Sequence, residues 1–279
     1  MSKCDLFSLN TAKCTKCGLC VSDCFFGALR RDANGTPYLK NSDRCMQCQH
    51  CFAICPKGAI SFKGHCAESA PAMHNLVLPD ENAMDNLIRA RRSVRHYADK
   101  DVDPSVLKRI LNTLGNAPTG CNARSLQFTC ISNRKAMNEL RHQFIKALEN
   151  FRLPNGKLIP RWIAAPAIQL RNGKRDIFFR GATGLLIISS NPKAPGVTTP
   201  NEDVVVAAAQ FDLLAQTHGL GTCWCGFLNL IDKEIPSLLP DVIGIPDGAP
   251  FSAVLFGHPA IKYARCVLRD QEATIDWRE

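Results

Sequence analysis

The sequence lacks any apolar run long enough to cross a membrane. Its longest apolar stretches, Leu185–Ile188 and Val204–Phe211, fall far short of the roughly twenty residues that a membrane-spanning helix needs. The opening residues, MSKCDLFSLN, also lack the basic and then apolar order of a secretory signal peptide. Both absences argue against a membrane or secreted protein, so we expect a soluble cytoplasmic protein that has no membrane partner.

Nucleotide-binding and nucleic-acid-binding signals are missing as well. No G-x-G-x-x-G stretch lies between a predicted strand and a predicted helix, which argues against a dedicated Rossmann domain. The formal net charge is +9, but no basic stretch is interleaved with base-stacking aromatic residues. The densest basic cluster is RARRSVR, Arg89–Arg95. We therefore expect no nucleic-acid partner.

Cysteine, in contrast, is abundant, with 15 residues in the chain. Two runs, CTKCGLCVSDC from Cys14 and CMQCQHCFAIC from Cys45, share the spacing C-x2-C-x2-C-x3-C. Zinc sites usually take two cysteines at a time, whereas three ligands at successive three-residue steps and a distant fourth suit a cubane cluster. A pair of zinc sites or a disulfide framework is the alternative, but the repetition of the complete pattern favours two [4Fe–4S] clusters.

The spacing also predicts which cysteines share a cluster. In two-cluster ferredoxins the fourth cysteine of each run ligates the other cluster. One predicted ligand set is therefore Cys14, Cys17, Cys20 and Cys55, and the other is Cys45, Cys48, Cys51 and Cys24. Pro56 follows Cys55 as the pattern expects, whereas Phe25 follows Cys24; the proline donates no ligand, so the assignment stands. The first 63 residues resemble a bacterial-type ferredoxin, and thiolate clusters together with many free thiols favour a reducing compartment.

The length of 279 residues allows a domain of about 200 residues beside a small one. We predict a ferredoxin-like domain over 1–63, a linker over 64–82 and a second domain over 83–279. Apolar spacing and capping residues predict helices over 84–93, 103–115, 135–151 and 201–219. Buried strands are predicted over 182–190 and 248–259, and no element is expected between Phe151 and Asp176. Long helical stretches between strands indicate an α+β fold.

Clusters deliver electrons singly, so a centre that collects them in pairs is expected, and a flavin does this. Four segments bear on a flavin site: RRSVR (91–95), APTGCNARSLQF (117–128), GLGTCWCGF (219–227) and FGHPAIKYAR (256–265). In order and spacing they resemble the signatures of the nitroreductase family, over roughly residues 84–279. The whole chain thus resembles a ferredoxin-fused nitroreductase.

The resemblance implies an FMN site in an intertwined homodimer. It assigns the phosphate, ribityl chain and pyrimidine edge to Arg91, Arg92, Ser93 and Arg95. A segment that reaches the flavin from the opposite subunit would contain Pro118, Thr119, Gly120 and Asn122. Backbone amides facing flavin N5 would come from Cys223, Trp224, Cys225 and Gly226, and further cations on the phosphate from Lys262 and Arg265. Taken singly, a solvated helix end and a helix-ending turn are ordinary alternatives for the first two segments. For Cys223 and Cys225 the alternative is a catalytic or redox pair, but C-x-C is not C-x-x-C, so we expect small side chains packed beside the ring or neighbours on the path from cluster to flavin.

The activity implied by the resemblance is FMN-dependent reduction of a small electrophile (a nitroaromatic, quinone or activated enone) by hydride from N5. Reduced ferredoxin or NAD(P)H would be the electron donor. The alternative is an electron-transfer flavoprotein that passes electrons between ferredoxin-like partners without a small-molecule substrate. The sequence leaves open the substrate, the donor, the proton source, whether the clusters feed the flavin, and which of Lys262 and Arg265 contacts the phosphate.

Overall fold

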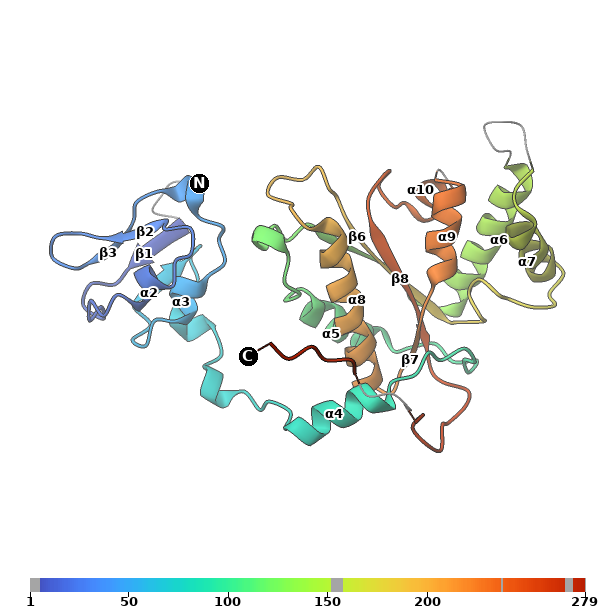
Figure 1. The fold of residues 1–279 in the computed structure, drawn as a ribbon, viewed down its shortest axis with the longest axis horizontal. Coiled ribbons are helices and arrows are strands. Elements are labelled where there is room, and N and C mark those ends of the chain that lie inside the picture. Colours follow the sequence, from blue (N-terminus) through green and yellow to red (C-terminus); the bar gives the residue numbers. More distant parts are fainter. Residues whose placement is uncertain (1–5, 152–157, 237, 269–272, 279) are drawn as a thin grey trace. The chain divides into compact units, whose positions relative to one another are not determined.

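The chain forms two compact units in the computed structural model, which describes residues 6–151, 158–236, 238–268 and 273–278 (Figure 1). One unit contains residues 1–79 and 121–123, and the other contains 80–120 and 124–279. The division after Pro79 falls inside the predicted linker, where the chain makes short 3₁₀ turns at Ala67–Ser69 and Met73–Asn75. Within the described ranges, none of the helices has the length and apolar character needed to span a membrane.

The first unit is built from short elements. Its helices are α2 (Leu19–Ser22) and α3 (His50–Ala53), with a 3₁₀ turn at Ser42–Arg44. Its strands form two antiparallel pairs, β1 (Phe7–Leu9) with β4 (Ile60–Phe62) and β2 (Leu29–Arg31) with β3 (Pro37–Leu39). A small core of Phe7, Cys20, Leu29 and Ile60 lies between them. So few buried side chains give a domain of this size little hydrophobic stabilisation.

The two cysteine runs share an unusual backbone conformation. In the first run Lys16 and Gly18 have positive φ, at 59° and 80°. In the second run the matching positions, Gln47 and Gln49, have φ of 56° and 62°. Left-handed residues other than glycine are uncommon, so their recurrence at matching positions shows that the sequence repeat is also a structural repeat.

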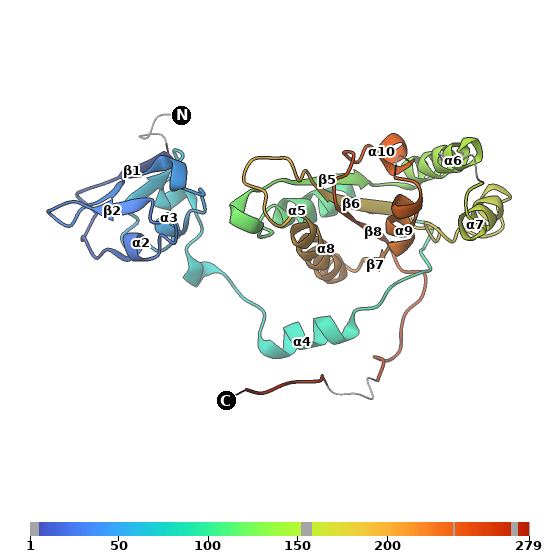
Figure 2. The same ribbon diagram turned by 45° about the horizontal axis from the view of Figure 1, so that its top comes forward.

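The second unit contains a four-stranded antiparallel sheet in the order β5-β6-β8-β7, and Figure 2 labels its four strands. The strands are β5 (Leu126–Ile131), β6 (Gly184–Ser190), β7 (Gly221–Trp224) and β8 (Phe251–Gly257). The helices are α4 (Glu81–Ala90), α5 (Pro104–Leu114), α6 (Arg134–Asn150), α7 (Arg161–Arg171), α8 (Pro200–Thr217), α9 (Gly226–Glu234) and α10 (Leu238–Ile243).

Helices cover both faces of this sheet. Leu185 and Ile187 of β6 pack in the core formed with α6, α7, α9 and α10, whereas Leu186 and Ile188 pack in the core formed with α5 and α8. Figure 2 shows the same layers, with α5 and α8 on one side of the strands and α6 and α10 on the other. Successive strand residues face opposite ways, so a strand that is buried on both faces is continuously apolar. The predicted α+β class is confirmed.

Several predicted elements match the structure closely. Asp103 caps α5 by accepting a hydrogen bond from Ser105 N–H (2.7 Å), and the helix ends before Gly115 as predicted. The predicted helices over 135–151 and 201–219 correspond to α6 and α8, and the strands over 182–190 and 248–259 contain β6 and β8. Strands β5 and β7 were not predicted.

Two expectations were wrong. The helix predicted over 84–93 ends at Ala90, because Arg91 has an extended backbone (ψ 133°) that leads the chain toward strand β7. The stretch between Phe151 and Asp176 contains α7, which has Pro166 inside it. An interior proline removes a helical hydrogen bond and usually argues against a helix, so the sequence pattern did not reveal α7.

Strand β6, one of the two central strands of the sheet, is expected to contribute strongly to the stability of the second unit. Ile187→Ala leaves a cavity between β6 and the helices of that face, and we expect a loss of about 2–5 kcal/mol in unfolding free energy. Val205→Ala, at a half-exposed position on α8, is the control and should change it by less than about 1 kcal/mol. Urea unfolding followed by tryptophan fluorescence measures this unit, since Trp162, Trp224 and Trp277 all belong to it. Equal midpoints for the two variants would contradict the core assignment.

Candidate functional site

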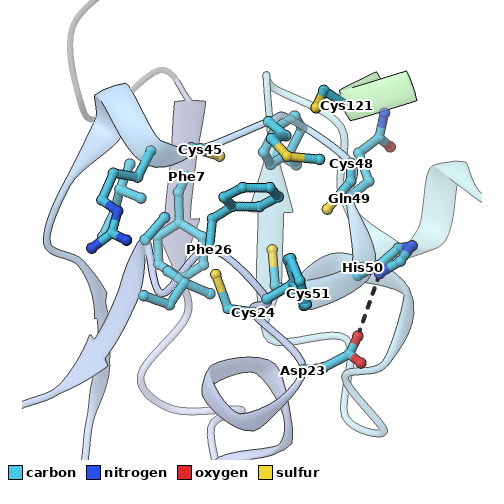
Figure 3. Close-up of a pocket in the computed structure, with 17 residues that line it drawn as sticks. Phe7, Asp23, Cys24, Phe26, Cys45, Cys48, Gln49, His50, Cys51 and Cys121 are labelled. Atoms are coloured by element: carbon cyan, nitrogen blue, oxygen red, sulfur yellow. Dashed lines mark ion pairs between the residues drawn. The ribbon is translucent and has the colours of Figure 1, made fainter. Parts of the chain in front are cut away.

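The eight cysteines of the two runs line two cavities in the first unit. Cys24, Cys45, Cys48 and Cys51 line a cavity of about 330 Å³ (Figure 3). Cys14, Cys17, Cys20 and Cys55 line a smaller one of about 20 Å³. All eight are free thiols. Each cavity therefore gathers three cysteines of one run and the last cysteine of the other, which is the grouping that the spacing predicts.

The larger cavity has an apolar wall. Phe7, Phe26 and Leu29 line it with the cysteines, and Figure 3 shows Phe26 among them. Burial, and to a lesser extent the neighbouring Cys45 and Cys48, raises the pKa of the Cys51 thiol to about 12. Without a nearby cation this thiol stays protonated at neutral pH, whereas a bound metal centre would favour the thiolate by its positive charge.

Backbone N–H groups point at sulfur atoms in the smaller cavity. Lys16 N lies 3.4 Å from Cys14 Sγ, and Ala59 N lies 3.3 Å from Cys55 Sγ. A hydrogen bond from the Leu19 backbone lowers the pKa of Cys17. Four thiols with such donors are a ligand set suited to an iron–sulfur cluster. The larger cavity has room for one, and the smaller must widen to admit one.

In the second unit, three of the four flavin-associated segments lie side by side. Val94 N–H donates to Thr222 O (2.7 Å), which joins the RRSVR segment to strand β7. Further along, Ala98 N–H donates to His258 O (2.8 Å) and Ala260 N–H donates to His96 O (2.9 Å). Backbone hydrogen bonds thus join residues 93–98 both to β7 and to the segment that follows β8.

A glycine makes the close approach to β7 possible. A Cβ atom on Gly221 would lie 2.6 Å from Val94 Cγ2, which real side chains do not tolerate. Ser93 and Thr222 also form an isolated parallel bridge at this point. In the sequence this contact was signalled by the glycines of GLGT (219–222). They lie in the GLGTCWCGF segment, but the sequence alone gave no reason for Gly221.

The arginines of the RRSVR segment point in different directions. Arg91 Nη1 lies 3.5 Å from Asp212 Oδ2. Arg92 Nη1 donates to the carbonyl oxygens of Arg89 and Arg91, while its Nη2 is buried without a hydrogen-bond partner among the described residues. Arg95 Nη1 lies 3.5 Å from Ser93 O. The unpartnered Arg92 nitrogen is a donor available to an anionic ligand.

The end of β7 and the start of α9 combine two buried thiols with an open helix start. Cys223 and Cys225 are buried, and Cys225 Sγ donates to Phe178 O (3.3 Å). Burial raises the pKa of Cys225 to about 12, so its thiol is protonated at neutral pH and is not a nucleophile. Gly226 begins α9 and has open space where a side chain would stand. The first N–H groups of a helix have no partner within it, so they can bind a ligand.

The 117–122 segment is attached to the start of α8. Gly120 N–H donates to Asp203 Oδ1 (2.9 Å), and Thr119 Oγ1 accepts from Arg124 N–H (2.9 Å). A Cβ on Gly120 would lie 2.1 Å from Thr199 Oγ1, which explains the glycine. Pro118 lies just before this turn, whereas Asn122 belongs to the first unit and donates to Met46 O (2.9 Å). Lys262 and Arg265 are exposed beyond β8.

Two buried carboxylates that the sequence interpretation missed lie on α8. Asp203 and Asp212 are each 4% exposed. Asp212 accepts hydrogen bonds from Thr222 Oγ1 and from Trp224 Nε1 (3.2 Å), and it faces Arg91. The available signal was an aspartate on the apolar side of a helix that the sequence predicts to lie in the core, because acidic residues are almost never fully buried without a partner.

Comparison with known proteins identifies both parts of the chain. The Nitroreductase family profile matches residues 88–258, which is more than half of the sequence. The chain belongs to the nitroreductase family. A 4Fe-4S dicluster domain profile matches residues 13–60. The prediction of a nitroreductase-type oxidoreductase behind a ferredoxin-like domain is thereby confirmed.

Individual relatives match either the nitroreductase part or the cluster-binding part of this nitroreductase family protein. A Methanothermobacter thermautotrophicus protein, provisionally named NADH dehydrogenase/NAD(P)H nitroreductase, is 24% identical over 62% of this chain and 75% of its own length. The archaeal-type glutamate synthase [NADPH] of Thermotoga maritima is 34% identical over 62 residues, which cover 22% of this chain and 12% of that protein.

Solved structures support the fold of the second unit. A Bacteroides fragilis nitroreductase with bound FMN matches with a TM-score of 0.54 and 22% identity, over 71% of this chain and 99% of that one. A Desulfitobacterium hafniense nitroreductase with bound FMN matches with a TM-score of 0.50 and 19% identity, over 71% and 100%. At these identities the similarity establishes the fold of this nitroreductase family chain.

Two ligation models can be told apart by experiment. In crossed ligation the last cysteine of each run binds the other run's cluster, and in local ligation each run binds its own cluster. Two complete clusters correspond to about eight iron and eight sulfide per chain. If Cys20 and Cys55 share a cluster, the double variant Cys20→Ala/Cys55→Ala loses one cluster and keeps about four iron, while Cys20→Ala/Cys24→Ala loses both. Iron and sulfide analysis after anaerobic reconstitution measures this. The reverse result, with four iron in the Cys20/Cys24 variant and none in the Cys20/Cys55 variant, would show local ligation instead.

Proposed function

We propose that this chain is an FMN-dependent oxidoreductase that takes electrons through two [4Fe–4S] clusters and reduces a small electrophilic acceptor at flavin N5. The acceptor classes are nitroaromatics, quinones and activated enones. The observation that carries the proposal is the backbone pairing of residues 93–98 with β7 and with residues 258–260, which joins three segments of the flavin signature. The FMN-bound relatives with the same fold support the choice of cofactor.

The chain's own residues fit a flavin phosphate and ring. Arg92 has a buried guanidinium nitrogen without a partner in the described part of the chain, and Arg91 is half-exposed. Guanidinium groups bind phosphate and carbonyl oxygens through paired donors. The first amides of α9, at Gly226, and the open space beside them suit the approach of a flat ring. When bound, FMN would supply hydride transfer and would convert single electrons into pairs.

The residue roles follow from these contacts. Arg91, Arg92, Ser93 and Arg95 would bind the phosphate, ribityl chain and pyrimidine edge. The backbone at Cys223, Trp224, Cys225 and Gly226 would face N5, with the two thiols packed and unreactive. Lys262 and Arg265, exposed beyond β8, are the candidate additional cations for the phosphate. No side chain in the described regions is assigned as proton donor.

A homodimer would complete the site. Within one chain the 118–120 segment is bound to Asp203, and the 91–95 and 222–226 segments face Asp212. These carboxylates are nine positions apart on α8, about 13 Å at the helical rise. In this proposal Pro118, Thr119, Gly120 and Asn122 reach each flavin from a second subunit.

The electron donor in this proposal is reduced ferredoxin or NAD(P)H. The second candidate function, an electron-transfer flavoprotein without a small substrate, gains support from the dicluster domain alone. In that case protein partners would reduce and reoxidise the flavin, and the chain would not reduce any small-molecule acceptor. Anaerobic assays with menadione, nitrobenzene and 2-cyclohexenone discriminate the two: turnover of any of them supports the enzyme, and no turnover of all three supports the carrier.

The phosphate assignment predicts a specific loss of affinity. Arg91→Ala removes a charge-assisted hydrogen bond worth roughly 1.5–3 kcal/mol, which weakens FMN binding by about one to two decades. Arg89→Ala, an exposed neighbour in the same basic cluster, is the control and should bind FMN like the parent chain. Fluorescence titration of the apoprotein with FMN measures both. Unchanged affinity in an Arg91→Ala/Arg95→Ala double variant would contradict the assignment.

The proposed electron route predicts a selective defect. Cys20→Ala/Cys55→Ala should lose acceptor reduction driven by reduced ferredoxin while keeping reduction driven by dithionite-reduced viologen, because only the cluster route is broken. Cys66→Ala changes an exposed cysteine outside both runs and is the control. Rates with each donor are compared under anaerobic conditions. Ferredoxin-driven rates that survive in the double variant would show that this cluster is not on the entry route.

A further inference from the structure

Helix α8 carries a buried carboxyl group in an apolar setting. Asp212 is 4% exposed, and its neighbours Ala208, Phe211 and Ala215 on the same helix are fully buried in the core. An ionised carboxylate in such a position is costly unless charged or hydrogen-bonded partners compensate it. Its contacts therefore matter more than those of a surface aspartate.

The donors to Asp212 come from the segments assigned to the flavin. Oδ1 accepts from the Thr222 hydroxyl. Oδ2 accepts from the indole N–H of Trp224 (3.2 Å) and faces Arg91 Nη1 (3.5 Å). One carboxylate oxygen is thus shared by a side chain of the RRSVR segment and by Trp224, the last residue of β7.

We propose that Asp212 is a positioning residue that holds the Trp224 indole and the Arg91 guanidinium in their binding geometry. This inference rests on the proposed FMN function. It adds a residue outside the four signature segments and identifies α8 as the element that fixes two of those segments against each other.

The two side chains need such a constraint. Trp224 is 38% exposed and Arg91 has a side-chain exposure of 35%, so packing alone does not select one conformation. An indole has a single N–H donor, and its bond to a buried acceptor selects the rotamer. The guanidinium of Arg91 is likewise held in advance, which lowers the ordering cost when a ligand binds.

A matched control lies on the same helix. Asp203 is also 4% exposed, but it accepts from Gly120 N–H and Thr199 Oγ1 and makes none of the Asp212 contacts. Replacing it removes an equally buried carboxylate from α8. General damage to the helix would change Trp224 in both the Asp203 and the Asp212 variants. Loss of a positioning contact would change Trp224 in the Asp212 variant alone.

The experiment uses the full chain with Trp162→Phe and Trp277→Phe, which leaves Trp224 as the sole tryptophan. Acrylamide quenching of the FMN-free chain measures how firmly Trp224 is held, and titration with FMN measures affinity. We expect Asp212→Leu to raise the quenching constant about twofold and the FMN dissociation constant about tenfold. Asp203→Leu should leave the quenching constant at the parent value.

Asp212→Asn tests rescue. Its amide oxygen can still accept from Trp224 while its NH₂ group donates to Thr222 Oγ1, so the quenching constant should return to the parent value. If Asp212→Leu does not fold, the FMN affinities of Asp212→Asn, Arg91→Ala and the double variant decide: a departure from additivity of at least about threefold supports the positioning pair. Additive effects would overturn it.

Failure of the Asp212 inference can be told apart from failure of the proposed FMN function. Parent-like quenching and FMN affinity in a folded Asp212→Leu chain overturn the inference and leave the proposed function intact. A parent chain that binds no FMN overturns the proposed function, and the role of Asp212 in flavin binding falls with it. Equal quenching changes in the Asp203→Leu and Asp212→Leu chains show a general helix effect and overturn the inference.

Discussion

The hydrogen bond from Val94 N–H to Thr222 O is the contact on which the candidate site of the second unit depends. It requires an extended backbone, so α4 ends at Ala90 and Arg91 leaves the helix. It also requires Gly221, because any side chain there would collide with Val94. One main-chain bond therefore explains a helix end, a glycine and the meeting of two segments that are far apart in the sequence.

The second constraint is the burial of carboxylates in α8. The helix packs one side against a face of the sheet, and Asp203 and Asp212 lie on that buried side among apolar residues. Replacing a buried ion pair by apolar residues is often neutral or stabilising, whereas removing one partner is strongly destabilising. Such groups add little net stability and instead restrict the arrangement of their donors. Here the donors are Thr199, which lies just before α8, and four residues of the signature segments: Gly120, Thr222, Trp224 and Arg91.

The first unit depends on a different kind of constraint. Its strands are three residues long and its core is small, so a cluster bound by four thiolates would contribute folding energy directly. The repeated left-handed residues at Lys16 and Gly18 and at Gln47 and Gln49 turn each run around its cavity. The last cysteine of each run then completes the other cavity. In the proposed function, the covalent link to the flavin unit keeps the donor at a high effective concentration.

Features that depend on local spacing could be predicted from the amino-acid sequence. Cysteine positions in the two runs predicted the grouping around each cavity, and Asp103 and Gly115 predicted the limits of α5, because ligand spacing and helix caps act over a few residues. The end of α4, the presence of α7 despite Pro166, the edge strand β7 and the partners of Asp212 followed only from the folded chain. These features depend on contacts between residues such as Val94 and Thr222 or Arg91 and Asp212, which are more than a hundred positions apart, and no local pattern encodes such pairings.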